Sequence, residues 1–156
     1  IMFVPHELFP VLESAVEDLD NKIKENRNKI QIICQESIMV NGDPQLLREA
    51  ITNLVENAIK YGLPLSEIQI SVTQTDMLYI HIDNEGDEIQ HKYRKRIFER
   101  FYRIDKSRDR EAGGTGLGLA IVKHIAFAHN GDVDVKRTSN GKTRFTISLP
   151  KMENEL

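Results

Sequence analysis

The sequence predicts an α/β fold, a two-layer sandwich in which helices cover one face of a mixed β-sheet. Segments with apolar residues at helical spacing are interspersed with short segments in which apolar and polar residues alternate. The chain has 156 residues, 40% hydrophobic and 29% charged, as expected for one globular domain with its own core. No apolar run reaches the ~18 residues of a membrane-spanning helix. We therefore expect one domain over residues 1–150 and a disordered tail over 151–156.

The first half of the chain is expected to contain two helices and a pair of short strands. Apolar spacing predicts a helix over residues 7–25, and strands over 30–34 and 38–40 around a turn. Asp43 followed by Pro44 is typical of a helix N-terminus. The helix that starts there is expected to end at Gly62 and Pro64, and to bury these residues: Leu47, Ile51, Leu54, Val55 and Ala58.

The second half alternates strands and helices. Period-two alternation predicts strands over residues 68–72 and 78–82. A third helix includes residues 96–98, and the stretch from 103 to 113 lacks apolar periodicity, so we expect a mobile loop. The remaining elements are a helix over 116–130, ended by Asn130, and a hairpin of strands 133–135 and 145–149. The helix is expected to bury Leu117, Ala120, Ile121, His124 or Ile125, and Ala128.

Charge and cysteine content exclude several classes of function. The net charge of −3 gives no general case for nucleic-acid binding. Cys34 is the single cysteine, which excludes an intrachain disulfide and fits a cytosolic compartment. Basic residues gather between Lys92 and Arg110, next to the glycine cluster described below, where some could meet phosphate oxygens.

A glycine cluster, Gly113-Gly114-Thr115-Gly116-Leu117-Gly118-Leu119, runs directly into the helix expected from residue 116. Bare amide groups at a helix N-terminus form an anion site, and glycine allows close approach of the backbone to a polyphosphate. No hydrophobic strand feeds into the cluster and no Gly-Lys-Ser/Thr follows, so it is neither a Rossmann fingerprint nor a P-loop.

Three further motifs precede the glycine cluster, at residues 53–61, 83–86 and 98–103: Asn-Leu-Val-Glu-Asn-Ala-Ile-Lys-Tyr, Asp-Asn-Glu-Gly and Phe-Glu-Arg-Phe-Tyr-Arg. With Gly114-Thr115-Gly116-Leu117-Gly118 they resemble the N, G1, F and G2 boxes of sensor histidine kinases. These boxes belong to Bergerat-type ATP-binding domains, a superfamily shared with gyrase, Hsp90 and MutL. The resemblance covers about residues 43–150, and is closest to PhoR- and VicK-like membrane sensors.

The resemblance implies that the chain binds ATP and Mg²⁺ between the helical layer and a flexible ATP lid at about residues 102–113. It assigns Asn57 to Mg²⁺ through its carbonyl oxygen, as a hard cation prefers. Lys60 and Arg103 would reach the phosphates, Tyr61 would lie at the same end of the pocket, and Asn53 would lie one turn before the metal ligand.

In the family, the aspartate of the second motif accepts a hydrogen bond from the adenine amino group, which assigns Asp83 to that role. The remaining nucleotide-binding residues implied by the resemblance are Gly86, Ile89, Phe98, Gly114, Thr115, Gly116, Leu117, Gly118, Leu119 and Thr146, with Thr143 as the alternative to Thr146. Glu88 stands where the family has a second glycine. We expect the loop to turn Glu88 into solvent, the alternative being that it enters the pocket and weakens binding.

Asn53 bears on the type of reaction. The ATP-hydrolysing branch of the superfamily has a glutamate at this position, and an amide cannot accept a proton at neutral pH. This favours phosphoryl transfer to a side chain over hydrolysis. The alternatives are a non-catalytic nucleotide-sensing module and a superfamily ATPase.

The acceptor histidine is expected on a separate, histidine-bearing dimerisation domain. His6 in Pro5-His6-Glu7-Leu8 lacks the basic residue and Thr-Pro of the family's acceptor motif. The resemblance therefore implies a cytoplasmic catalytic part of a longer kinase, with a cognate response regulator as partner. The whole protein would be a membrane-bound homodimer, and the isolated domain a monomer.

Overall fold

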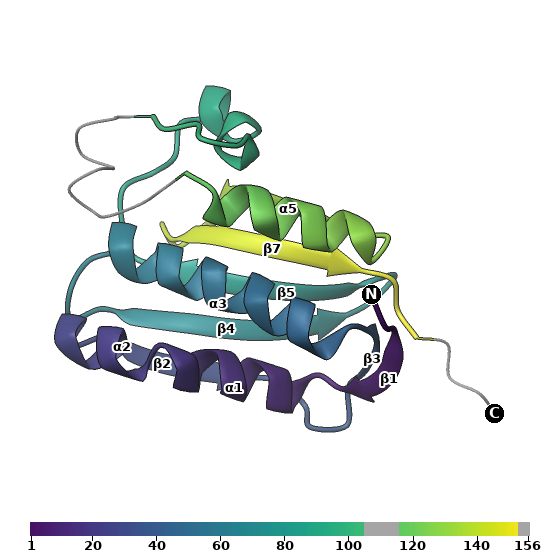
Figure 1. Ribbon diagram of the computed structural model, residues 1–156. Helices are drawn as coiled ribbons and strands as arrows, with labels where there is room; N and C mark the ends of the chain where they lie inside the picture. Colours follow the sequence, from purple (N-terminus) through teal and green to yellow (C-terminus); the bar gives the residue numbers. More distant parts are fainter. Residues whose placement is uncertain (105–115, 153–156) are drawn as a thin grey trace.

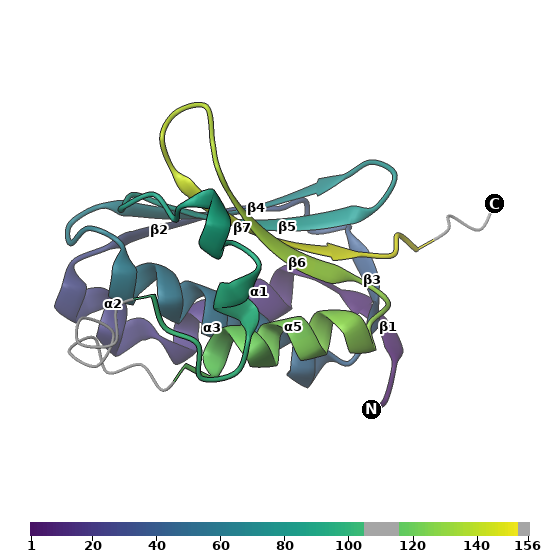
Figure 2. The same ribbon diagram turned by 90° about the horizontal axis from the view of Figure 1, so that it is seen from above.

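The computed structural model describes residues 1–104 and 116–152. Helices and strands segregate into two layers, with the helices on one face of the main sheet (Figures 1 and 2). The first six elements are β1 (Val4–Glu7), α1 (Phe9–Asp18), α2 (Asp20–Asn26), β2 (Lys29–Ile33), β3 (Met39–Gly42) and α3 (Pro44–Tyr61). The others are β4 (Glu67–Gln74), β5 (Leu78–Asn84), the short 3-10 turns η1 (His91–Tyr93) and η2 (Arg96–Phe98), α5 (Gly118–Ala128), β6 (Asp132–Arg137) and β7 (Thr143–Leu149).

The main sheet is mixed and has the strand order β2-β4-β5-β7-β6. β2 pairs with β4 in parallel, and the other neighbours pair antiparallel. The parallel pair needs a long crossover, and the chain between the two strands includes α3. The predicted fold class, a mixed sheet with helices on one face, is confirmed.

The core fills the space between the two layers. The five residues that the sequence predicts on the buried face of α3 are all at most 1% exposed. They meet the sheet residues that point toward the helices, among them Ile70, Ile80, Ile82, Phe145 and Ile147. Burying such aliphatic and aromatic side chains is the main force that holds the layers together.

α3 begins as the sequence predicts. The Asp43 carboxylate accepts hydrogen bonds from the backbone N–H groups of Gln45 and Leu46, and Pro44 occupies the first turn. These bonds keep the pKa of Asp43 below its usual value. Gly62 ends the helix, also as predicted. The start and the end of the longest helix are therefore set by local sequence.

The N-terminal region differs from the prediction of one helix over 7–25. Residues 4–7 form β1, and the helical part divides into α1 and α2 at Leu19, whose backbone leaves the helical region. The expected pair of strands is present but its members do not pair with each other. β3 pairs with β1, and β2 joins the main sheet through β4, so long-range pairing overrides the local turn.

Two helices differ from their predicted form. The expected helix around 96–98 is reduced to η1 and η2. α5 is shorter than 116–130, and its buried residues are Val122, Ile125 and Ala126. Leu117, Ala120, Ile121 and Ala128, which were also expected to be buried, are only partly buried. Leu117 and Ile121 border a cavity instead of the core. Asn130 has the left-handed conformation expected after the helix, with φ 60°.

The C-terminal hairpin forms as predicted, with Gly141 at φ 80° in its turn. Most of the predicted lid and of the predicted tail lie outside the described residues. Over residues 1–104 and 116–152, no helix combines the length and apolar character needed to cross a membrane.

Candidate functional site

A cavity of about 700 Å³ opens on the side of α3 near its C-terminal end. Its walls come from α3, the end of β5 and the loop after it, η1 and η2, the start of α5, and β7. Ten residues that the sequence assigns to the site line this cavity: Asn53, Asn57, Lys60, Tyr61, Ile89, Arg103, Gly116, Leu117, Gly118 and Leu119. Segments far apart in sequence thus meet at one site.

The amides of Asn53 and Asn57 project from α3 one turn apart and both line the cavity. The Nδ2 atom of Asn53 is buried, and it has no hydrogen-bond partner among the residues that the structure describes. A buried donor without an acceptor costs free energy. The Nδ2 atom of Asn53 could donate to an oxygen-rich ligand, such as a phosphate or a water molecule bound to a metal ion.

Glu56, which the sequence did not single out, lies between the two amides in sequence and also lines the cavity. Its carboxylate accepts from Lys22 of α2 at 2.7 Å and contacts Lys60 at 3.3 Å. The hydrogen bond from Lys22 and the charge of Lys60 keep the pKa of Glu56 below its usual value despite partial burial. Lys60 is therefore held at the edge of the cavity by an anion that remains charged at neutral pH.

The glycines at the start of α5 keep the backbone close to the cavity. Gly116 has φ 77°, and a Cβ atom there would lie 2.9 Å from the Cα atom of Phe101. The Phe101 N–H group donates to the Gly116 carbonyl at 2.8 Å, which ties the two motifs together. Gly118 is the first residue of α5, and among the described residues outside its chain neighbours and its own helix backbone, no atom lies within 4 Å of a Cβ built on it. The N-terminus of α5 is thus bare of side chains at Gly118, as an anion site requires.

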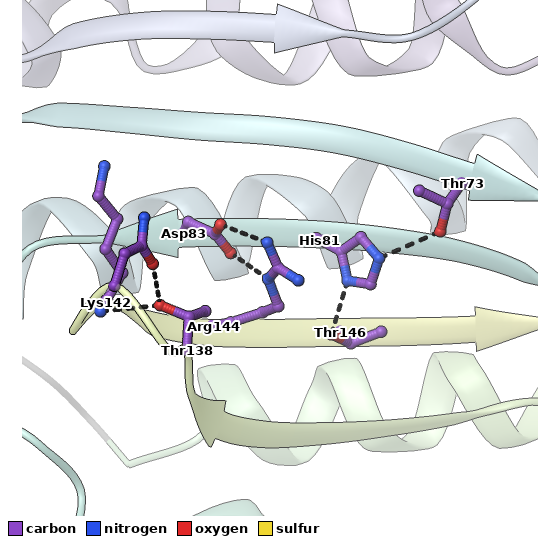
Figure 3. Close-up of polar contacts among 8 residues, drawn as sticks. Thr73, His81, Asp83, Thr138, Lys142, Arg144 and Thr146 are labelled. Carbon is purple, nitrogen blue, oxygen red and sulfur yellow. Dashed lines mark hydrogen bonds and ion pairs between the residues drawn. The ribbon is translucent and has the colours of Figure 1, made fainter.

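Asp83 does not line the cavity, so the geometry gives no support to its predicted contact with adenine. Its carboxylate forms two hydrogen bonds of 2.7 Å with Arg144 of β7. Figure 3 shows this pair on the sheet face turned away from the helices, beside His81 and Thr146. Asp83 is 5% exposed, so the ion pair with Arg144 explains its burial.

Asn84 lines the cavity in place of Asp83, and it is 4% exposed. Successive residues of a strand point to opposite faces. Leu78, Ile80 and Ile82 are buried under the helices, so Asn84 belongs to the same face and Asp83 to the other. This alternation is visible in the sequence and would have identified Asn84.

Gly86 does not line the cavity either. It pairs with Gly62, and a Cβ atom at Gly86 would lie 2.9 Å from the Tyr61 carbonyl oxygen. Glycine is needed here for close approach to the end of α3. On the other side, Arg137 donates to the Gly86 carbonyl at 2.9 Å. The loop after β5 is fixed from both sides.

Glu88 lies at the cavity wall, but its side chain is 59% exposed and pairs with Arg94 at 3.3 Å. Arg94 also donates to the Ile89 carbonyl at 3.0 Å, so one side chain holds both residues of the loop. This arrangement agrees with the expectation that Glu88 faces solvent, although its backbone borders the site.

Two other predicted residues lie away from the cavity. Phe98 is 7% exposed and packs edge-on against Phe145, with the ring centres 6.1 Å apart. Thr146 lies on the outer face of the sheet, where it hydrogen-bonds to His81. Thr143, the alternative to Thr146, does line the cavity. Alternation along β7 separates the two threonines, as it separates Asp83 from Asn84.

The sequence did not single out several other lining residues. These are aromatic or aliphatic and come from the segment before the glycine cluster, from α5 and from β7: Tyr93, Ile97, Tyr102, Ile104, Ile121 and Phe145. An apolar wall with a few convergent polar groups is typical of a small-molecule site. Gly114, Thr115 and the basic residues from 106 to 110 lie outside the described residues.

The residues present fit a magnesium ion at the α3 side of the cavity. The amide oxygen of Asn57 is a hard ligand, and Mg²⁺ commonly takes few protein ligands together with waters and phosphates. The buried Nδ2 atom of Asn53, which has no partner in the described part of the chain, would meet an oxygen in that shell. The start of α5 provides the matching site for phosphates.

Comparison with known families agrees with this chemistry. Residues 42–153 match the family described as histidine kinase-, DNA gyrase B- and HSP90-like ATPase. The sensor histidine kinase CusS of Escherichia coli O157:H7 is 40% identical over 138 residues, which cover 87% of this chain and 28% of CusS. The sensor-like histidine kinase SenX3 of Mycolicibacterium smegmatis is 43% identical over 113 residues, covering 72% of this chain and 29% of SenX3.

Solved structures show the same fold. The mycobacterial sensor histidine kinase MprB superposes with a TM-score of 0.84 at 25% identity, covering 98% of this chain and all (100%) of that structure. The ATP-binding domain of PrrB from Mycobacterium tuberculosis gives a TM-score of 0.75 at 26% identity, covering 97% of this chain and 98% of that domain. The chain spans less than a third of the length of the two curated relatives above.

Proposed function

Because the chain belongs to the family of histidine kinase-, DNA gyrase B- and HSP90-like ATPases, we propose that it is the catalytic domain of a sensor histidine kinase. It binds Mg-ATP and transfers the γ-phosphoryl group to a histidine on a separate dimerisation domain. In that step the bond from the γ-phosphorus to the bridging oxygen breaks, a bond to an imidazole nitrogen forms, and ADP leaves.

The observation that carries this proposal is the meeting of two kinds of group in one cavity. The α3 amides and Lys60 form one wall, and the glycine-bearing start of α5 lies on another. Asn57 would hold Mg²⁺, which neutralises charge on the phosphates when bound. The buried Asn53 amide would donate an N–H group, for which the described residues offer no acceptor, to an oxygen in the same shell.

Three groups of this chain would position the phosphates. The backbone amides at Gly118 and Leu119 begin α5, where the helix dipole favours an anion. Lys60 is held at the cavity edge by Glu56, so it needs only a side-chain rotation to reach a phosphate oxygen. Arg103, in the first residues of the predicted lid, also lines the cavity. In phosphoryl transfer, such positioning and charge neutralisation supply most of the catalysis.

Transfer is favoured over hydrolysis by the absence of a suitable base on the cavity face of α3. Asn53 lines the cavity at the position where the hydrolysing branch has glutamate, and an amide does not accept a proton. Glu56 is the one carboxylate of α3 that lines the cavity. Its lowered pKa and its two lysine partners make it a poor base.

The acceptor lies elsewhere in this proposal. His6 is in β1, with its Nδ1 atom 2.8 Å from the Val4 carbonyl, so it sits in a short strand. The partners would be the histidine-bearing dimerisation domain of the same kinase and a cognate response regulator, in a membrane-bound homodimer with this domain in the cytoplasm. CusS, named as a sensor histidine kinase, and SenX3, named as a sensor-like histidine kinase, support the assignment to a kinase.

Labelled ATP with and without a histidine-bearing dimerisation domain tests the proposal. We expect acid-labile, base-stable label on the dimerisation domain, and only when Mg²⁺ is present. Binding of ATP without transfer would support the nucleotide-sensing alternative. Release of free phosphate without a labelled protein would support a superfamily ATPase.

A further inference from the structure

We propose that Glu56 and Lys22 control how readily Lys60 reaches the phosphates, which makes Lys22 of α2 a positioning residue for the nucleotide although it does not line the cavity. The inference rests on the proposed function, because it concerns the phosphates bound in the same cavity. It adds to the site a residue from α2, an element that none of the sequence motifs includes.

One carboxylate oxygen holds two lysines at the edge of the cavity. The Nζ atom of Lys22 donates to Oε1 of Glu56 at 2.7 Å, and the Nζ atom of Lys60 lies 3.3 Å from the same oxygen. Glu56 and Lys60 both line the cavity, with side chains only 25% and 27% exposed. Lys22 is 52% exposed and reaches Glu56 from α2. Two like charges therefore converge on one oxygen, and the more loosely held one belongs to the residue that lines the cavity.

The packing of α2 against α3 sets the position of Lys22. Its neighbour Ile23 belongs to the core. Asn26, the last residue of α2, donates from Nδ2 to the Ile59 carbonyl of α3 at 3.5 Å. An anchored helix thus carries Lys22 to Glu56, so the contact is a defined feature of the fold.

A phosphate in the cavity would compete with Glu56 for Lys60. When Lys60 moves to the phosphate, Glu56 loses one cation, and a partly buried carboxylate without a partner costs free energy. Lys22 limits this cost, because its shorter bond to Glu56 stays in place. The movement also separates two ammonium groups that repel each other at the shared oxygen. Glu56 therefore opposes nucleotide binding by retaining Lys60, and Lys22 offsets that opposition.

Calorimetric titration with Mg-ATP tests the role of Glu56. Glu56→Gln keeps the shape of the side chain and removes the charge that retains Lys60, so we expect Mg-ATP to bind at least about twofold tighter. A purely structural role would not tighten binding. Direct repulsion of the phosphates by the carboxylate would, and the Lys60→Ala background distinguishes the two causes. In that background, Glu56→Gln should change the affinity by less than about twofold.

The same titration of Lys22→Ala tests the positioning role. We expect Mg-ATP to bind at least about twofold more weakly, because Glu56 then has Lys60 as its one remaining lysine partner. In the Glu56→Gln background, Lys22→Ala should change the affinity by less than about twofold. The control is Lys24→Ala, which removes the same charge from an exposed residue of α2 that pairs with Asp20 at 2.9 Å. It should leave the affinity unchanged.

The outcomes separate the inference from the function on which it rests. A folded Glu56→Gln variant that binds Mg-ATP less than about twofold tighter would overturn the inference, as would an equal gain in the Lys60→Ala background. Equal affinities of Lys22→Ala and Lys24→Ala would also overturn it. If Lys60→Ala binds too weakly to titrate, the comparison of these two lysine variants decides. Failure of the unchanged chain to bind Mg-ATP would overturn the proposed function as well.

Discussion

Asp83 and Asn84 are adjacent residues with different roles, because β5 turns them to opposite faces of the sheet. Asn84 reaches the cavity, and Asp83 joins Arg144 in a bidentate pair that raises the pKa of the arginine. The motif alone favours the aspartate, since the family resemblance assigns that residue to adenine. Strand alternation instead places Asp83 in a pair with Arg144 on the outer face of the sheet, and we expect its role to be structural.

Asp83→Ala should therefore lower stability and leave ATP affinity within about threefold of its original value. Loss of the two charge-assisted bonds, with Arg144 left half-buried, should cost about 1–3 kcal/mol of unfolding free energy. Urea unfolding and ATP titration measure the two quantities. The control is Asp134→Ala. Asp134 lies on β6, on the same outer face of the sheet as Asp83, and its substitution should change stability by less than about 0.5 kcal/mol. A tenfold loss of ATP affinity in folded Asp83→Ala would return this residue to the site.

Glu88→Gly should change ATP affinity by less than about tenfold, because the carboxylate is mostly in solvent and paired with Arg94. Glu85→Gly adds the same backbone freedom to an exposed residue of the same loop and serves as the control. A gain of tenfold or more in Glu88→Gly alone would show that the carboxylate repels the nucleotide, and would favour a weakly binding sensor.

Among the elements, α3 and α5 carry the site, and one buried histidine links them at the end away from the cavity. His129 follows α5 and is 3% exposed. Its Nδ1–H group donates to the Ile125 carbonyl at 2.8 Å, and its Nε2 atom accepts from the Asp43 N–H group at 3.0 Å. The ring also stacks on Phe3, with centres 4.7 Å apart. The end of α5 is thus joined to the start of α3.

His129→Ala should destabilise the domain by about 1–3 kcal/mol or more, because it leaves the Asp43 N–H group and the Ile125 carbonyl without these partners. His124→Ala, an exposed histidine on α5, is the matched control and should have little effect. Thermal or urea unfolding of the two variants measures the difference. Equal stability of both variants would show that the link between the helices contributes nothing.

The same elements show what the sequence can predict. α3 was predicted closely because its cap, its stop and its apolar spacing are all local signals. β2 and β3 were located, but not their partners, because pairing with β4 and β1 is decided by burial in the assembled sheet. β1 is too short to show periodicity. At the site, the sequence motifs identify many of the residues that line the cavity. Lining residues such as Tyr93 and Phe145 carry no motif assignment to the site, and only the folded chain brings them to the cavity.

At the scale of the whole molecule, the helices cover one face of the sheet (Figure 2), and the other face carries polar side chains that include Asp83 and Arg144 (Figure 3). His81 lies on that face, between Thr73 and Thr146. Burial lowers its pKa first, and Arg144 and Lys136 lower it further, while Asp83 opposes them. The folded protein therefore takes up a proton on His81 less readily than the unfolded chain does.

This difference in proton binding between the folded and unfolded states predicts how the stability of the domain depends on pH. Above the ordinary value of 6.5, His81 is neutral in both states and contributes no pH dependence. Below it, the unfolded chain binds the proton first, so stability falls with pH until the lowered pKa of the folded state is reached. The stability of the unchanged protein relative to His81→Gln should therefore fall between about pH 7 and pH 5 and stay constant between about pH 7 and pH 8. A difference that is constant over the whole range would contradict this assignment.

The central claim is that the α3 cavity binds Mg-ATP for phosphoryl transfer, and Asn57 tests it most directly. The measurement is Mg²⁺-dependent label transfer from ATP to a histidine-bearing dimerisation domain, with Asn57→Ala compared with Asn21→Ala, an exposed asparagine on α2. We predict that Asn57→Ala abolishes transfer while its circular dichroism stays unchanged, and that Asn21→Ala transfers normally. Magnesium-dependent transfer by Asn57→Ala at the unchanged rate would contradict the account.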